Sequence, residues 1–217
     1  MFLPIKNTKK FKFPSEEIVI KSFVVDKSFN IIGQTSDYEA WILSCFSKFS
    51  KNIFEFGTAS GKTTTLFALN SPDNSKIHTI TLKPKQVDSV SFKKMDSKVA
   101  IYNALNESIY DDFIFKSMNI CNKINLIFGD SKKFNEKELS DQIDLIFIDG
   151  GHNYSCVKND TEKAFSMLRK GGYIFWHDYV IGKTSSKDVV KYLNEISIDK
   201  KIFHIKDTSL CCYQRTE

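Results

Sequence analysis

Short hydrophobic runs recur along the chain from residue 52 onward, and amphipathic stretches with helical spacing separate them. The runs cover residues 52–57, 77–82, 124–129, 143–149 and 173–178. Most of them end in Gly or Asp, and uninterrupted runs of this length are typical of strands buried on both faces of a parallel sheet. Strand-like runs that alternate with helix-like stretches predict an α/β fold with a mostly parallel sheet.

Two predicted helices are marked by signals at their ends. Ser36, with Glu39 three residues later, forms a capping box, and hydrophobic residues at helical spacing follow it. Residues 157–168 place their hydrophobic positions on one side, and Gly171 and Gly172 are expected to stop that helix. The second helix is therefore expected to cross over between the fourth and fifth predicted strands.

The remaining segments complete the expected organisation. Residues 202–214 consist of two short hydrophobic runs around a turn, which predicts an antiparallel C-terminal hairpin at the sheet edge and brings the expected strands to seven. Residues 1–35 predict an N-terminal arm, with a short strand or hairpin around residues 18–32. Residues 36–217 predict one domain, in which residues 83–123 form a helical insertion that could act as a lid.

Composition narrows the classes of function. The 217 residues carry a formal net charge of +5, but Arg169 and Arg215 are the only arginines. Arginine is favoured for reading bases and clamping phosphates, so a nucleic-acid partner is not expected. No hydrophobic run approaches the roughly 18 residues of a membrane helix, and the first residues lack the hydrophobic region of a secretion signal. We therefore expect a cytoplasmic protein with no membrane partner, whose oligomeric state, a homo-oligomer included, is left open.

The five cysteines do not change this picture. They are scattered along the chain and include no C-x-x-C pair. Without a secretion signal, such a set predicts neither a disulfide framework nor a zinc site. We expect them to be buried thiols.

A glycine-containing loop follows the first predicted strand. Gly57 and Gly61 allow a tight turn and a close approach to a ligand, and the free amides at the start of the next helix attract a polar or anionic group. A P-loop needs four residues between its glycines, whereas three separate them here, namely Thr58, Ala59 and Ser60. A dinucleotide-binding fold needs G-x-G-x-x-G and an acid after the second strand, and the sequence has neither.

The same loop resembles that of a known family. Residues 55–61 have the pattern Glu-x-Gly-x-Ala-x-Gly and resemble the E-x-G-x-G-x-G loop of class I S-adenosylmethionine (SAM) dependent methyltransferases, with Ala59 at the middle glycine. Residues 124–131 look like the third-strand G-D-S segment of the same class. Further segments in consistent order are similar to the family that includes cephalosporin hydroxylase-like and sugar or macrolide O-methyltransferases: residues 144–154, 157–160, 168–172 and 176–179. The resemblance covers residues 34–180. It implies a Rossmann-like, doubly wound sheet and methyl transfer from SAM to a hydroxyl oxygen of a small-molecule acceptor, such as a sugar or natural product.

The resemblance also implies cofactor contacts. Glu55 would organise the amino group of SAM, and the loop would lie against the methionine end through Gly57, Thr58, Ala59, Ser60 and Gly61. Asp130 and Ser131 follow the third predicted strand, where the family contacts adenine, although either residue could instead cap a helix. Thr81 stands where the family has an acid for the ribose hydroxyls, which is a departure from the pattern. Asp149 is also expected to contact the cofactor.

Candidate catalytic and metal-binding residues follow the fourth and fifth predicted strands. Asp149 closes the fourth strand, and His177 and Asp178 close the fifth. In catechol-type and some sugar O-methyltransferases such positions bind a divalent metal. Oxygen ligands would suit magnesium, but a histidine is an unusual member of a magnesium set, and direct hydrogen bonding to substrate is the alternative. His152 and Asp149 are the candidate catalytic residues, with His152 either the base that takes the acceptor proton or a structural residue of the turn.

Two other functions stay open. Residues 145–149 also imitate a Walker B strand, so a P-loop-like nucleotide-binding phosphotransferase is one alternative. The missing acid near Thr81 favours the other alternative, a non-catalytic Rossmann-like binding module. Binding of SAM distinguishes all three.

Overall fold

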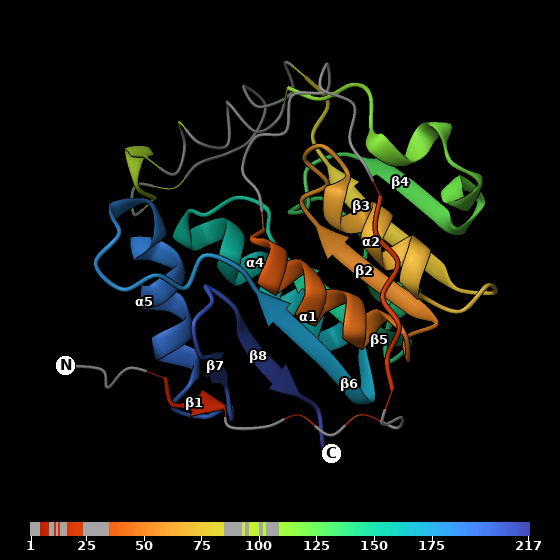
Figure 1. Ribbon diagram of the computed structural model, residues 1–217. Coiled ribbons are helices and arrows are strands. Elements are labelled where there is room, and N and C mark those ends of the chain that lie inside the picture. Colours follow the sequence, from red (N-terminus) through yellow and green to blue (C-terminus); the bar gives the residue numbers. More distant parts are fainter. Residues whose placement is uncertain are drawn as a thin grey trace.

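A mixed sheet forms the centre of the molecule. The computed structural model describes residues 5–8, 11, 13, 17–23, 35–84, 93, 96–99, 102 and 109–217. The sheet has the order β1-β7-β8-β6-β5-β2-β3-β4 (Figure 1). Its strands are β1 (Asn7–Thr8), β2 (Asn52–Phe56), β3 (Lys76–Thr81), β4 (Ile124–Phe128), β5 (Ile143–Ile148), β6 (Leu168–Trp176), β7 (Phe203–Ile205) and β8 (Cys211–Gln214).

The direction of the strands agrees with the prediction. Strand β8 pairs antiparallel with both β6 and β7, and all other neighbouring strands pair in parallel. The predicted Rossmann-like α/β sheet with a C-terminal antiparallel hairpin is confirmed, and its seven strands are β2 to β8. Strand β1, which the sequence did not predict, adds a short parallel edge beside β7.

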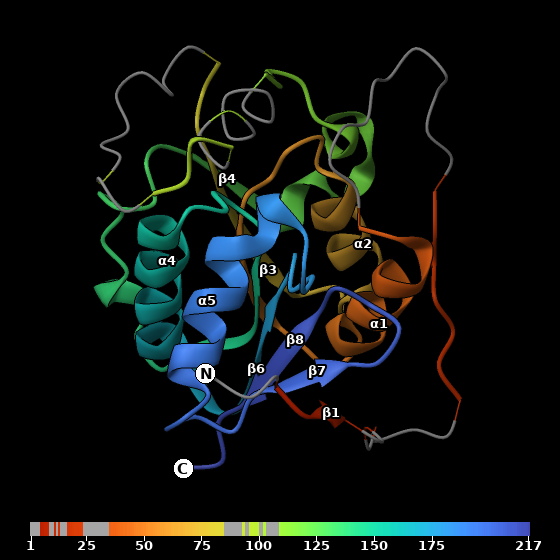
Figure 2. The same cartoon turned by 90° about the vertical axis from the view of Figure 1, so that its left-hand side faces the viewer.

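Helices cover both faces of the sheet. The α-helices whose bounds the described residues give are α1 (Asp37–Ser47), α2 (Lys62–Asn70), α4 (Tyr154–Met167) and α5 (Lys187–Ile196). Figure 2 shows α1 and α2 on one side of the sheet and α4 and α5 on the other. The predicted capping box at Ser36 is present, because Ser36 Oγ accepts a hydrogen bond from Glu39 N and the Glu39 carboxylate accepts one from Ser36 N.

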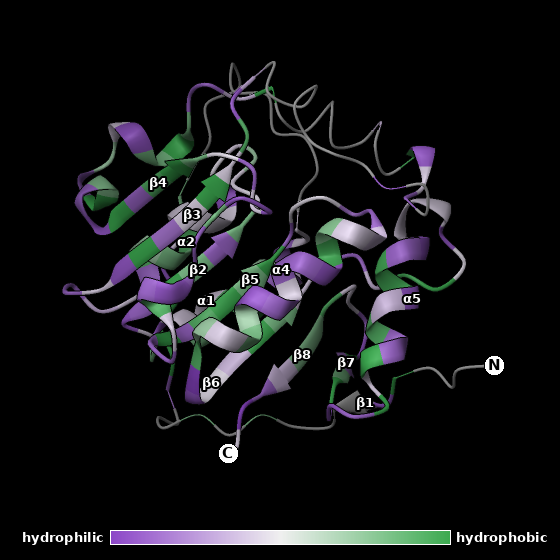
Figure 3. Ribbon diagram, turned by 180° about the vertical axis from the view of Figure 1, so that it is seen from behind, coloured by the Kyte–Doolittle hydropathy of each residue, from purple (hydrophilic) through white to green (hydrophobic). Residues whose placement is uncertain are grey.

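Alternating side chains of the strands fill the two resulting cores. Phe54 and Phe56 pack with the α4 and α5 side, whereas Ile53 packs with α1 and α2. All six residues of β5 are buried, as expected for a central parallel strand, and Figure 3 shows hydrophobic residues concentrated along the central strands. This packing fixes the carboxyl ends of β6, β5 and β2 side by side.

The prediction that Gly171 and Gly172 stop a helix was wrong. Helix α4 already ends at Met167, and both glycines lie in β6. A Cβ atom on Gly172 would lie 2.8 Å from Leu168 Cδ1 and 2.9 Å from the Asp144 carbonyl oxygen. Glycine is therefore needed because β6 approaches β5 closely there, at an irregularity in the pairing of the two strands.

The arm and the insertion are described only in part. Residues 18–23 of the predicted hairpin contain no strand, and residues 24–32 lie outside the described residues. Much of the insertion between residues 85 and 108 also lies outside them, while its described end forms two 3₁₀ helices, η2 (Ile114–Ser117) and η3 (Asn119–Lys123). The helical lid therefore stays a prediction. Two further 3₁₀ helices are η4 (Lys137–Leu139) and η5 (Thr184–Ser186).

Hydropathy of the helices gives one further result. Within the described part of the chain, no helix is long and apolar enough to cross a bilayer.

Candidate active site

The candidate site lies at the carboxyl edge of the sheet. Because β6, β5 and β2 are neighbours, the loop after β2, Asp149 after β5 and His177 after β6 come together. Thr81 ends β3 and Asp130 follows β4, so they continue the same edge on its far side. The sequence-predicted site residues therefore share one edge, as expected.

The loop after β2 adopts the backbone conformation that its glycines suggest. Gly57, Ala59 and Gly61 all have positive φ, at 94°, 43° and 82°. A Cβ on Gly57 would lie 2.2 Å from the Asp149 carbonyl oxygen, and one on Gly61 would lie 2.9 Å from the Phe115 ring. Both glycines are thus required by contacts within the protein, and Ala59 occupies a left-handed conformation that favours glycine.

Glu55 is buried beside this loop. It is 1% exposed, and its Oε2 accepts hydrogen bonds from the hydroxyls of Thr64 on α2 and Thr79 on β3. The Thr58 and Thr79 hydroxyls lie 2.6 Å apart and extend this network to the loop. Burial raises the pKa of Glu55 to about 8, although the two hydroxyl donors oppose the shift. Hydrogen bonds through Thr79 and Thr58 therefore connect the Glu55 side chain to the loop after β2. Its contact with SAM stays a prediction.

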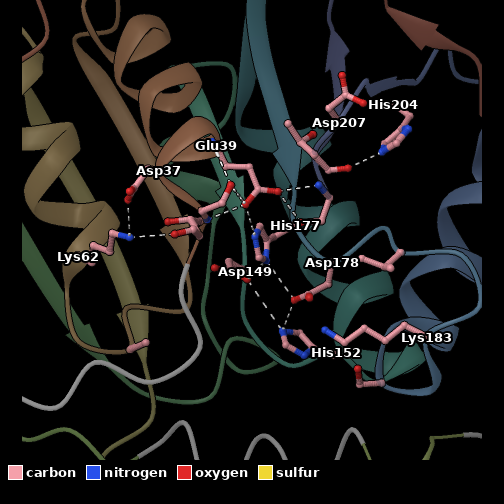
Figure 4. A pocket seen from close by; sticks show the side chains of 17 residues that line it. Asp37, Glu39, Lys62, Asp149, His152, His177, Asp178, Lys183, His204 and Asp207 are labelled. Carbon is pink, nitrogen blue, oxygen red and sulfur yellow. Dashed lines mark hydrogen bonds and ion pairs between the residues drawn. The ribbon is translucent and has the colours of Figure 1, made fainter.

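His177 lies at the centre of a cluster of carboxylates (Figure 4). Its Nδ1 is 3.1 Å from Asp149 Oδ1 and 3.2 Å from Asp178 Oδ2, and its Nε2 is 3.3 Å from Glu39 Oε2. All four side chains are at most 17% exposed. Three acids, one on α1, one directly after β5 and one in the loop after β6, therefore surround one imidazole.

The charges in this cluster stabilise one another. Burial disfavours a charged imidazole, but Asp149, Asp178 and Glu39 outweigh it and hold the pKa of His177 well above its usual range. Burial would likewise raise the pKa values of Glu39 and Asp178, but hydrogen bonds from His177 and other donors hold both well below their usual range. The cluster thus consists of an imidazolium paired with carboxylates.

His152 joins the cluster through Asp178. Its Nε2 lies 3.0 Å from Asp178 Oδ2 and 4.0 Å from Asp149 Oδ1. One donor atom each from Asp149, His152 and Asp178 lies within 4.8 Å of the others, which is close enough for a shared metal ion. The sequence had assigned His177 to the metal set and His152 to the base, whereas the residues whose donor atoms lie this close together are Asp149, His152 and Asp178.

A cavity of about 830 Å³ opens over the cluster. Asp149, His152 and Asp178 line it together with Ala59 of the loop after β2. Ala59 and Val180 are its only hydrophobic lining residues within the described part of the chain. The wall is therefore suited to a polar ligand.

Lys62 occupies a different position from that of a phosphate-binding P-loop lysine. Its Nζ donates to the Thr35 carbonyl oxygen at 2.8 Å and lies 4.0 Å from Asp37 Oδ1. The ammonium thus tethers the segment that leads into α1. This arrangement gives no support to the nucleotide-binding alternative.

The predicted adenine contacts lie outside the lining of this cavity. Asp130 Oδ1 accepts a hydrogen bond from Lys132 N at 2.9 Å, as in a local turn, while its Oδ2 is buried without a partner among the described residues. The Ser131 hydroxyl bonds to Asp160 on α4. The side-chain amide of Asn153, at the start of α4, is also buried without a partner in the described chain. Such buried groups usually have a partner, so a ligand at Asp130 is consistent with the geometry.

Sequence reasoning missed the part that Glu39 plays in the site. It identified Glu39 only as the third residue of a capping box, and the structure confirms that bond. The same carboxylate, on a residue that is 4% exposed as a whole, also accepts bonds from His177 and Ser209, which lie 138 and 170 residues away in the chain. A local pattern carries no signal for such distant partners.

Comparisons with known proteins agree with this geometry. A family model described as a methyltransferase domain matches residues 54–179, more than half of the chain. An uncharacterized protein of Acanthamoeba polyphaga mimivirus is 39% identical over 61 residues, which are 28% of this chain and 27% of that protein.

Solved structures show the same fold. The O-methyltransferase TomG from Streptomyces achromogenes, in complex with SAM, has a TM-score of 0.56 at 12% identity, covering 84% of this chain and 82% of that one. The methyltransferase PaMTH1 from Podospora anserina, bound to SAH, has a TM-score of 0.59 at 16% identity, covering 85% and 80%. These structures share the fold of the chain, and the family match over more than half of its length shows that the chain belongs to the methyltransferase domain family.

Proposed function

We propose that this protein transfers the methyl group of SAM to a hydroxyl oxygen of a small molecule such as a sugar or a natural product. One observation carries the proposal: Asp149, His152, His177 and Asp178 gather beside the loop after β2, in a single polar cavity at the carboxyl edge of the sheet. A hydroxyl acceptor beside SAM needs such a site, where its oxygen is aligned with the methyl group and its proton has an acceptor. Solved relatives with this fold include O-methyltransferases.

The cofactor would bind along the carboxyl ends of β2, β3 and β4. The loop of residues 57–61 and the start of α2 would receive the methionine end, since no side chain caps that helix start. Thr81 would lie near the ribose, and the buried, unpartnered Oδ2 of Asp130 would accept from the adenine amino group, with Ser131 alongside. Glu55 would organise the amino group of SAM through its hydrogen-bond network with the Thr79 and Thr58 hydroxyls.

The reaction needs an oxygen nucleophile in line with the carbon–sulfur bond. A lone pair of the acceptor oxygen forms the bond to the methyl carbon while the carbon–sulfur bond breaks and its electrons stay on sulfur. The acceptor proton passes to His152, which Asp178 orients at 3.0 Å. Asp149 would help to hold the acceptor hydroxyl and the methyl group of SAM next to His152 and Asp178.

A divalent metal also fits the residues present. Asp149, His152 and Asp178 would hold it, and such an ion lowers the pKa of a coordinated hydroxyl. A set of two carboxylates with imidazole nitrogen is better suited to manganese, iron or zinc than to the magnesium suggested by oxygen ligands alone. Chelation followed by addition of magnesium, manganese or zinc, with turnover measured after each step, distinguishes metal-assisted transfer from transfer by His152 alone.

Calorimetric titration with SAM and with its demethylated product tests the proposal directly. We expect saturable binding of both, lost or strongly weakened in Asp130→Ala. The control Lys62→Ala should bind SAM as the wild type does, because Lys62 bonds to Thr35 rather than to a ligand. Binding of ATP with magnesium, abolished by Lys62→Ala, would support the phosphotransferase instead.

The acceptor is best identified from compounds that co-purify with the protein. Mass spectrometry of the released ligands, followed by assay of each with SAM, should yield a product heavier by one methylene. A folded protein that binds neither SAM nor its demethylated product would favour the non-catalytic module.

A further inference from the structure

One carboxylate, that of Glu39, joins three segments that are distant in the sequence. Its Oε1 accepts from Ser209 N at 2.6 Å and Ser209 Oγ at 2.8 Å, in the turn between β7 and β8. Its Oε2 accepts from Ser36 N at 2.8 Å, at the start of α1, and lies 3.3 Å from His177 Nε2, after β6. Glu39 therefore connects three segments that line the cavity, at Ser36, His177 and Ser209.

The contact with His177 determines how that imidazole is presented. A carboxylate can only accept, so Nε2 of His177 carries a hydrogen that points to Glu39. The opposite nitrogen, Nδ1, then faces Asp149 at 3.1 Å and Asp178 at 3.2 Å. The orientation of the ring and the placement of both acids are thus coupled to a residue on a different helix.

Glu39 itself is held in place by hydrogen bonds at both of its carboxylate oxygens. Both of its carboxylate oxygens accept a backbone N–H group, one from Ser36 and one from Ser209. The side chain is 6% exposed. An exposed carboxylate side chain loses conformational entropy when it is held in one position, whereas the Glu39 side chain is already fixed before any ligand binds.

We propose that Glu39 is a positioning residue for the methyl-transfer site. By accepting the Nε2 hydrogen of His177 it directs Nδ1 to Asp149 and Asp178, and by binding Ser209 it connects the β7–β8 turn to the same carboxylate. Carboxylate–histidine pairs that orient a ring nitrogen toward a reactive centre or an ion work in this way. The catalytic consequence rests on the proposed function, while the orientation of His177 does not.

Glu39→Gln is the sharpest change that the geometry offers. The amide of glutamine has the same shape as the carboxylate. In the wild type, however, each carboxylate oxygen accepts a backbone N–H group, so in the variant either orientation of the amide places its NH₂ group against a backbone donor. In one orientation an NH₂ group faces His177 Nε2, and in the other the NH₂ group faces Ser209 N and leaves only a neutral oxygen at His177, so the charged, fixed acceptor is lost in both. The matched control is Asp144→Asn, because Asp144 Oδ2 also accepts two backbone N–H groups, from Lys51 and Asn52, but at the opposite end of β5.

Nitrogen NMR of ¹⁵N-histidine protein reads the orientation directly, because the chain has only four histidines. The His177 signals are assigned by their loss in His177→Gln. In the wild type we expect a protonated Nε2 at His177. In Glu39→Gln the His177 signals should move while those of His78 on β3 stay, and Glu39→Asp, which keeps the charge, should restore them in part. Asp144→Asn should leave the His177 signals in place.

An unprotonated Nε2 of His177 in the wild type would overturn the inference without any variant, which covers the case in which Glu39→Gln does not fold. Unchanged His177 signals in a folded Glu39→Gln protein would overturn it as well. Calorimetric titration of the same samples with SAM separates the two claims: a wild type with the expected His177 signals but no SAM binding refutes the proposed function and leaves the orientation by Glu39 standing.

Discussion

Gly57 packs directly against the backbone of Asp149, so that a Cβ on Gly57 would lie 2.2 Å from the Asp149 carbonyl oxygen. The loop after β2 and the loop after β5 are thereby held together without any side chain between them. This contact places Ala59, on the first loop, and Asp149 in the wall of the same cavity. The distance between these two loops therefore depends on the absence of a side chain at Gly57.

Gly57→Ala should destabilise the protein by about 2–5 kcal/mol. The φ of 94° costs an L residue about 1–2 kcal/mol, and the clash with Asp149 adds an overpacking cost of about 1–3 kcal/mol. Gly182→Ala is the matched control, because Gly182 has a φ of 85° with open space around its Cβ position. It should cost only about 1 kcal/mol. Urea unfolding measures both, and equal losses would show that the contact with Asp149 has no energetic weight.

Ala59→Gly should stabilise the protein by about 0.5–1 kcal/mol. Ala59 has a φ of 43°, and glycine adopts this conformation without the strain of a side chain, although it also adds entropy to the unfolded chain. The same substitution at Ala40, in the helix α1, should destabilise by about 1 kcal/mol. Opposite signs in thermal unfolding are thus expected for one chemical change, and a loss of stability in Ala59→Gly would contradict the explanation.

Glu55→Gln should alter the dependence of stability on pH. The folded pKa of about 8 lies above the unfolded value of 4.5, so the folded protein binds more protons than the unfolded chain between these values. The stability contributed by Glu55 is therefore present below pH 4.5 and is lost as the pH rises through 8. Glu55→Gln lacks this titration. Urea unfolding at pH 5, 7 and 9 should show the variant gaining stability relative to the wild type at each step, and a constant difference across that range would contradict the raised pKa.

Asp96→Ala should weaken the start of α4 by about 1–2 kcal/mol. Asp96 accepts hydrogen bonds from Ser155 N at 2.9 Å and Ser155 Oγ at 2.8 Å, whereas the N-cap residue Asn153 makes no such bond. A carboxylate from the insertion thus caps this helix. Glu162→Ala, which removes an exposed ion pair with Lys158 on the same helix, should change stability by no more than about 0.5 kcal/mol. Equal unfolding midpoints for the two variants would exclude the capping role of Asp96.

Local patterns were enough to predict most of the elements. The run of residues 143–149 became β5 (Ile143–Ile148), and the capping box at Ser36 opens α1 as expected. Both signals are local, because burial on two faces requires a continuous hydrophobic run and a cap acts within one turn. The order of the strands along the chain also placed Asp149 and Asp178 at one edge.

One signal with two explanations was misinterpreted from the sequence alone. Gly171 and Gly172 have the composition of a helix stop, but they lie in β6, where Gly172 is needed for the approach to Asp144 of β5. A glycine pair reports only that backbone freedom is needed. What requires that freedom depends on which segment packs against it.

The sequence by itself determined the α/β class, the direction of the strands and the residue types at the carboxyl edge. Only the tertiary structure decided that Glu39 meets His177 and Ser209, and that His152 pairs with Asp178. The reason is physical: hydrophobic periodicity and capping act over a few residues, whereas hydrogen bonds between side chains depend on distances of about 3 Å that are set when separate elements pack together.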